Sequence, residues 1–140
     1  MKIHVKTTSL LIFLTVLLSA CGGGSLHLGK LKIGEVRIGM FETRGPNHMA
    51  YSYTTFSGHE SDPIELESGQ ILTVDYQVQM TKGSLTIEIQ SPQNKVLWQK
   101  NFDSDASDSI EIQAQESGQH FMIISAEAAG GSVDVSWLSE

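Results

Sequence analysis

Apolar and polar residues alternate along most of the chain from residue 30 to residue 140, in short runs separated by Gly, Ser, Asn, Asp and Pro. Residues 72–80 show the pattern clearly, because the even positions are apolar or aromatic and the odd positions are polar. Residues 85–90 and 133–138 follow the same period of two. This period places apolar side chains on one face of a strand, so each run predicts a half-buried antiparallel strand.

Further strands are predicted by the same criteria at residues 30–41, 49–57, 63–67, 95–102, 109–114 and 119–126. A shift of the alternation at Gly34-Glu35 predicts a β-bulge in the first of these strands. No stretch keeps a 3.6-residue apolar period for three turns. Eight or nine short strands are typical of a sandwich or barrel, and we expect an all-β fold: a single antiparallel β-sandwich of jelly-roll type.

One motif occurs twice in this region. Glu67-Ser68-Gly69-Gln70 recurs as Glu116-Ser117-Gly118-Gln119, and each copy is followed by a strand, a turn with glycine and a second strand that opens with Gly-Ser. The favoured interpretation is that the glycine supplies the positive φ of a tight entry into the strand. The alternative is an internal duplication or a pseudo-twofold pair of sheets.

The first 20 residues have a different pattern. Lys2 and Lys6 are basic with no acidic neighbour, and residues 9–18 are almost wholly apolar. A helix of about ten residues is roughly 15 Å long, half of the hydrocarbon thickness of a bilayer. The apolar run is therefore too short for a stable transmembrane helix and predicts a cleaved signal peptide over residues 1–20.

Leu18-Ser19-Ala20-Cys21 resembles the lipobox of bacterial lipoproteins, in which two small residues precede the cysteine that is lipidated and becomes the new N-terminus. Cys21 is the single cysteine of the chain, so a disulfide within the chain cannot explain it. The resemblance implies a diacylglyceryl thioether on Cys21, often with an N-acyl chain such as palmitate, and two buried chains suffice for stable anchoring. The alternative is an ordinary secretory signal that happens to end before a cysteine.

The lipobox resemblance also predicts a location. The protein is expected at the bacterial cell membrane or the outer membrane, held by its lipid and exposed outside the cytoplasm. Gly22, rather than an acidic residue, follows the cysteine and permits sorting to the outer membrane in bacteria that have one. Residues 21–29, which include Gly22-Gly23-Gly24-Ser25, are expected to form a flexible tether.

The length of the remaining chain limits the number of its domains, and its net charge limits the partners that it can bind. Residues 30–140 are long enough for one domain with a real core. Without Lys2 and Lys6, seven basic side chains face 16 acidic ones, a formal charge of −9. This balance argues against nucleic acid as a partner and against electrostatic adhesion to anionic lipid.

From Glu60 to Trp137 the order of features resembles GOLD-type and related jelly-roll sandwich domains. The shared features are the segments GSLTIEIQSP and KVLWQKNF, an acidic loop and the segment ESGQHFMIIS. The resemblance covers about half of the chain and implies a module that interacts with cargo, peptides or proteins. It carries no catalytic residue across, and the paired cysteines of some such domains are absent here.

The segment DSDASD, residues 103–108, is the candidate for a metal site. It places the carboxylates of Asp103, Asp105 and Asp108 between two predicted strands, and spaced carboxylates are the ligands that Ca²⁺ prefers. It lacks the glycine and glutamate that an EF-hand loop has at its sixth and twelfth positions. The favoured alternative is a solvated hairpin loop without a cofactor, which would also keep edge strands from pairing.

Histidine chemistry gives little support for catalysis. Among His27, His48, His59 and His120, no two have the spacing of a preformed metal pair, and neither G-x-S-x-G nor H-E-x-x-H occurs. We therefore do not expect an enzyme. The alternative is a metal-dependent or hydrolytic envelope enzyme that uses His59, His120 or the acidic segment.

Aromatic residues supply the candidate binding surface. Tyr51 and Tyr53 share one face of a predicted strand, and the preceding loop carries Arg44 and His48. Exposed aromatic side chains stack on sugars and are frequent hot spots of protein interfaces, so these four residues are the candidate ligand contacts. Trp98 and Trp137 alternate with aliphatic residues and are expected in the core.

These observations predict a lipid-anchored lipoprotein of the bacterial cell envelope that acts without catalysis. It is expected to bind a protein, a peptide or a glycan close to the membrane. Confinement to a surface raises the effective concentration of such a module, so that a modest affinity suffices. Besides the enzyme named above, a structural component of an envelope assembly is the remaining alternative.

Overall fold

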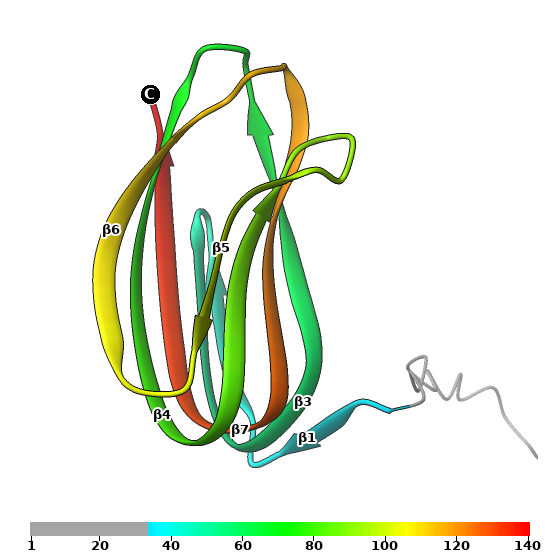
Figure 1. Cartoon of the computed structure of the whole chain (residues 1–140), viewed down its shortest axis with the longest axis vertical. Helices are drawn as coiled ribbons and strands as arrows, with labels where there is room; N and C mark the ends of the chain where they lie inside the picture. Colours follow the sequence, from blue (N-terminus) through cyan, green and yellow to red (C-terminus); the bar gives the residue numbers. More distant parts are fainter. Residues whose placement is uncertain (1–33) are drawn as a thin grey trace, which may run out of the picture. The chain divides into compact units, whose positions relative to one another are not determined.

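The computed structural model describes residues 34–140, which form an antiparallel all-β structure (Figure 1). Its strands are β1 (Val36–Ile38), β2 (Phe41–Gly45), β3 (His48–Leu66), β4 (Ile71–Gln90), β5 (Val96–Phe102), β6 (Ala106–Gln113) and β7 (Gly118–Ser139). No helix in this range is long and apolar enough to cross a bilayer. The signal peptide, the lipidated Cys21 and the tether predicted for residues 1–29 lie outside the described residues.

Three long strands, β3, β7 and β4, lie side by side in the centre, and all three turn through the same end of the molecule in Figure 1. Because each long strand bends, its two halves belong to two different layers. The first layer, in hydrogen-bonded order, contains β2, residues 48–53 of β3, residues 131–139 of β7, residues 71–80 of β4, and β6. The second layer contains residues 58–66 of β3, 118–126 of β7, 84–90 of β4, and β5.

The bends of β4 and β7 lie against each other and depend on glycine. The register between the two strands shifts around Lys82, which pairs with Gly130. Gly83 and Gly131 have φ values of 69° and 135°, which residues other than glycine rarely adopt. A Cβ atom on Gly131 would lie 1.9 Å from the carbonyl oxygen of Gln79, so no side chain fits there without moving the backbone of β4.

The bend of β3 has a different cause. Its register with β7 shifts on both sides of Phe56, which is the signature of a bulge. The bulge changes the buried positions from odd numbers before it to even numbers after it. Ser57 also accepts a hydrogen bond of 2.9 Å from the backbone N–H of Ala128, a residue of β7 with φ of 48°. The bends of β3 and β7 are thus joined.

The core lies between the two layers. One cluster of buried side chains draws on both halves of each long strand, for example Val74 and Ile87 of β4, and Val135 and Ile124 of β7. Across one edge, the Tyr76 ring of the first layer lies 5.8 Å and 5.3 Å from the rings of Trp98 and Phe102 in β5. Shared burial therefore holds the two layers face to face.

The structure confirms the predicted fold class, an antiparallel jelly-roll-like sandwich, but the strand boundaries differ. Three pairs of predicted strands are continuous, because 49–57 joins 63–67 in β3, 72–80 joins 85–90 in β4, and 119–126 joins 133–138 in β7. The expected bulge at Gly34-Glu35 is wrong. The described residues place a turn at Gly34, and the break between β1 and β2 occurs at Gly39, where φ is 60°.

The repeated Glu-Ser-Gly-Gln motif has the predicted backbone role. Gly69 and Gly118 have φ values of 94° and 134°, and each lies at the entry to a long strand. The two copies also meet in space, since the backbone N–H of Ser68 donates to the hydroxyl oxygen of Ser117 at 2.9 Å. The motif therefore fixes two neighbouring strand entries at one end of the sandwich.

We predict that Gly131→Ala destabilises the fold by more than about 3 kcal/mol, because it combines a strained φ with a clash against backbone. Gly69→Ala is the matched control, since its φ is also positive but no atom lies within 4 Å of the added Cβ. That variant should lose only about 1–2 kcal/mol from backbone strain. Urea unfolding curves measure both, and equal losses would contradict the role given to the bend.

Candidate functional site

A groove crosses the outer face of the first layer, away from the core. Its volume is about 340 Å³, and its walls come from β2, β3, β7 and β4. The strand register arranges the lining side chains in two rows across the sheet. The first row is Phe41, Ser52, Ser132 and Gln79, and the second row is Thr43, Ala50, Asp134 and Gln77.

The groove exists because the two central strands carry small side chains where the flanking strands carry large ones. Ala50, Ser52 and Ser132 form the floor on β3 and β7. Phe41 rises from β2 on one side, and Gln77 and Gln79 rise from β4 on the other. Since neighbouring strands are about 4.8 Å apart, the two walls stand about 14 Å apart.

Phe41 is the most unusual residue of this surface. Its side chain is 77% exposed, although the described domain buries most of its other aromatic rings. Phe41 pairs with Ser52 across the strands, and this pairing directs both side chains to the outer face. The phenyl ring therefore stands at the rim of the groove with a face open to a ligand.

The polar side chains that line the groove can form hydrogen bonds, and none of them is basic. The glutamine amides and the serine and threonine hydroxyls each offer donors and acceptors. Asp134, whose side chain is 56% exposed, contacts Nε2 of His48 at 3.0 Å through Oδ1. The lining residues include the acid Asp134 and no lysine or arginine.

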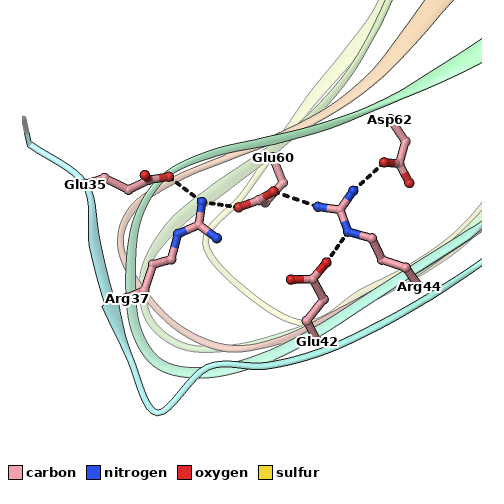
Figure 2. A network of polar contacts seen from close by, with 6 residues as sticks. All are labelled: Glu35, Arg37, Glu42, Arg44, Glu60 and Asp62. Atoms are coloured by element: carbon pink, nitrogen blue, oxygen red, sulfur yellow. Dashed lines mark hydrogen bonds and ion pairs between the residues drawn. The ribbon is translucent and has the colours of Figure 1, made fainter. Parts of the chain in front are cut away.

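The inner face of β2 carries an ionic network that links this edge strand to the second layer (Figure 2). Arg44 contacts Glu60 at 2.7 Å and also pairs with Glu42 and Asp62. Glu60 in turn pairs with Arg37, which contacts Glu35 at 2.6 Å. The guanidinium groups of Arg37 in β1 and Arg44 in β2 thus join four carboxylates, one from β2, two from β3 and one from the residue before β1.

The bulge in β3 explains why these charges meet. Glu42 and Arg44 pair with the buried residues Tyr51 and Met49, so they point inward from β2. Beyond the bulge the inward positions of β3 are even-numbered, which turns Glu60 and Asp62 toward the same side as the buried Ile64. Inward charges at an edge also oppose pairing with another sheet edge.

The network lies against Tyr51, one of two buried tyrosines on β3. The guanidinium of Arg44 lies 5.5 Å from the centre of the Tyr51 ring, a cation–π contact. Burial raises the pKa of Tyr51, although the nearby Arg44 acts in the opposite direction. Burial alone raises the pKa of Tyr53 to about 12. Partial burial acts to lower the pKa of Arg44, but the hydrogen bond with Glu42 and the neighbouring charges raise it.

The predicted aromatic surface on Tyr51 and Tyr53 is wrong for the rings themselves. Their side chains are only 2% and 4% exposed, because both point into the core together with Met49. The strand that carries them nevertheless lines the groove through its opposite face, at Ala50 and Ser52. The alternation of β3 was predicted correctly, but which face turned outward was not.

Arg44 and His48 lie on opposite sides of the β2–β3 hairpin. Arg44 is engaged inward by the network, whereas His48 lies on the outer face next to Asp134. The hairpin turn consists of Pro46 and Asn47, with Asn47 at φ of 57°. A ligand contact by His48 remains a prediction. Arg44 instead ties β2 to the acids of β3 and so holds the edge strand in place.

The acidic segment has structural contacts in the described chain. Oδ1 of Asp105 accepts a hydrogen bond of 2.8 Å from the backbone N–H of Met80, and Oδ1 of Asp108 accepts one of 2.9 Å from Ser109. Among residues 34–140, no group of three or more His, Cys, Asp or Glu side chains is arranged to hold a metal ion. Calcium binding by Asp103, Asp105 and Asp108 therefore remains a prediction without a preformed site.

The two histidines of the enzyme hypothesis do not share a cleft. His59 pairs with Ser125 and is exposed, whereas His120 pairs with Ile64 and is completely buried. Five positions of β3 separate the two pairs, about 17 Å along the strand. Nδ1 of His120 contacts the carbonyl oxygen of Gly118 at 3.0 Å. Both histidines thus lie apart from each other and from the groove.

No protein-family model matches the sequence, and a search of curated proteins gave no match. Solved structures are similar in fold. Tailspike protein 4 of bacteriophage CBA120, in its enzymatically active domain, matches 76% of this chain and 19% of its own at 9% identity, with a TM-score of 0.50.

Some of the similar structures were solved with a bound sugar, including the following two. TmCBM61 in complex with β-1,4-galactotriose matches 72% of this chain and 69% of its own at 13% identity, with a TM-score of 0.45. A carbohydrate-binding module of Cellvibrio mixtus lichenase 5A in complex with cellotriose matches 75% and 86% at 19% identity, with a TM-score of 0.43. At these identities the likeness concerns the fold alone.

Sequence reasoning missed the residues that form the groove. Gln77 and Gln79 were recognised only as the wet side of a strand, and Phe41 only as the end of one. One sequence feature could have pointed to the groove: small residues at alternate positions of two strands, namely Ala50 and Ser52 on β3 and Ser132 on β7. It becomes a groove only when the register places these strands side by side.

We predict that Arg44→Met lowers the free energy of unfolding by about 1–3 kcal/mol. This value lies between those of exposed and buried ion pairs, because the removed charge leaves the half-buried Glu60 and Asp62 with one cation fewer. Lys82→Met is the control, since Lys82 donates to Thr55 outside the network. Denaturant unfolding measures both variants, and equal stability of the two would refute the structural role of the network.

Proposed function

We propose that this protein is a non-enzymatic carbohydrate-binding module and that the groove on the outer face of the first layer is its binding site. The observation that carries the proposal is the exposed Phe41 ring standing opposite the Gln77 and Gln79 amides across a floor of small residues. Concave sites that combine an apolar wall with a few placed polar groups are typical ligand sites.

The chemistry of the two walls matches the two surfaces of a sugar ring. A pyranose presents C–H groups on its faces, which pack on an aromatic ring, and hydroxyl groups around its rim. Phe41 offers the aromatic face. The amides of Gln77 and Gln79 and the carboxylate of Asp134 offer the acceptors and donors that hydroxyl pairs require.

Charge narrows the class of glycan. The groove contains Asp134 and no lysine or arginine, and the whole chain has a formal charge of −7. Polysaccharides rich in carboxylate or sulfate groups would be repelled by this field. Neutral sugars, or sugars that carry an amine, are the favoured ligands.

The lipobox resemblance supports a proposed location for this module. Lipid on Cys21 would hold the domain at the surface of a bacterial membrane, outside the cytoplasm. Glycans of the envelope or of the surroundings would then meet the groove at a high local concentration, which compensates for the modest affinity of a shallow site.

We predict that Phe41→Ala weakens glycan binding at least tenfold, a loss of about 1.4 kcal/mol, without changing stability. Affinity electrophoresis provides the measurement, in gels that contain hydroxyethyl cellulose, β-1,4-galactan, glycol chitosan, alginate or carboxymethyl cellulose. Retention by neutral or amine-bearing polymers and loss of retention in the variant are expected.

Leu138→Ala is the control for that experiment, because Leu138 is 55% exposed on the same face but does not line the groove. It should bind as the unaltered protein does. If no glycan in the panel is retained, or if Leu138→Ala and Phe41→Ala behave alike, the proposed function is wrong. Preferential retention by alginate, which is rich in carboxylates, would contradict the inference that the ligand lacks acidic groups.

We predict that Cys21→Ser moves the protein from the membrane fraction to the soluble fraction when it is expressed in a bacterium. The reason is that serine lacks the thiol that accepts the diacylglyceryl group. Incorporation of a labelled palmitate analogue provides the second readout and should disappear in the variant. Unchanged membrane association with no label in either protein would exclude lipid attachment.

A further inference from the structure

A second hollow adjoins the groove on the far side of β4. Its volume is about 280 Å³, and it is lined by Gln77, Val78, Gln79, Asp105, Ala106 and Ser107. The two glutamines line the first groove as well. The hollows therefore share one wall, which consists of two flexible polar side chains.

The strand register shows that the two hollows continue one row across the sheet. Gln77 pairs with Asp134 of β7 on one side and with Ser107 of β6 on the other. The row Thr43, Ala50, Asp134, Gln77 and Ser107 thus crosses every strand of the first layer. With four spacings of about 4.8 Å, it is about 19 Å long.

The second hollow has the same chemical character as the first. Ala106 is small, Ser107 offers a hydroxyl, and Asp105 is the acid. The hydrogen bond from Met80 to Asp105 fixes the start of β6 beside β4. As in the groove, the lining residues include no lysine or arginine.

We infer that the two hollows form one extended site for an oligosaccharide without acidic groups, which runs across the strands from Phe41 to Ser107. The amides of Gln77 and Gln79 lie at the boundary between the two hollows, where a carboxamide can donate to one sugar unit and accept from the next. This inference rests on the proposed function and adds the length and direction of the ligand. A single sugar unit would occupy only the compartment beside Phe41.

The test is a variant that fills only the second hollow. Ser107→Trp places a bulky side chain there, on an exposed strand position that tolerates aromatic residues. Ser109→Trp is the matched control, because Ser109 lies on the same face of β6 two residues further and pairs with Asp75, outside both hollows.

The probes are oligosaccharides of two to six units that match the polymer that the gels retain: cello-oligosaccharides for hydroxyethyl cellulose, galacto-oligosaccharides for galactan, or chitosan oligosaccharides for glycol chitosan. Calorimetry of the unaltered protein should show affinity that rises with chain length. Ser107→Trp should bind the shortest ligand normally and lose about tenfold for the longest. Ser109→Trp should follow the unaltered protein at every length.

The outcomes separate the two levels of the proposal. An identical length dependence in Ser107→Trp and the unaltered protein would overturn the extended site but leave the groove at Phe41 in place. Loss of all ligands in Ser107→Trp, with normal stability, would also overturn it, because the first compartment should remain open. If the unaltered protein binds no glycan, both the proposed function and this inference fall.

Discussion

The common bend of β3, β4 and β7 is the constraint on which the rest of the structure depends. It divides three long strands between two layers, so that each strand buries residues from both of its halves in one core. Gly83 and Gly131 allow the backbones of β4 and β7 to approach where a Cβ would collide. Without that approach the sheet would remain open, and one of its faces would expose apolar side chains to water.

The bend also determines which residues meet at the edge. The bulge around Phe56 reverses the parity of β3, and the acids Glu60 and Asp62 consequently point toward β2. Arg44 links these acids to the inner face of the strand whose outer face carries Phe41. A network on one side of β2 therefore sets the position of the groove wall on the other side.

The sequence predicted the fold class and most strand segments, because a period of two is a local signal. It could not predict that 49–57 and 63–67 are one strand, since the bulge looks like a break when no partner strand is known. The burial of Tyr51 was missed for the same reason: alternation defines two faces but not which one is covered. The groove depends on the register between β3 and β7, a long-range property that no local pattern contains.

The exposure of Phe41 is itself an argument for a ligand. An aromatic ring on an edge strand is a liability, because unpaired edges and exposed apolar groups promote association. In this domain the liability is limited by inward charges on β2 and by the net negative charge of the chain. Core packing does not require this ring, since 77% of its surface is in contact with solvent. A ring that contributes little to the core, beside a floor of small residues and opposite two amides, is placed where a sugar face can cover it.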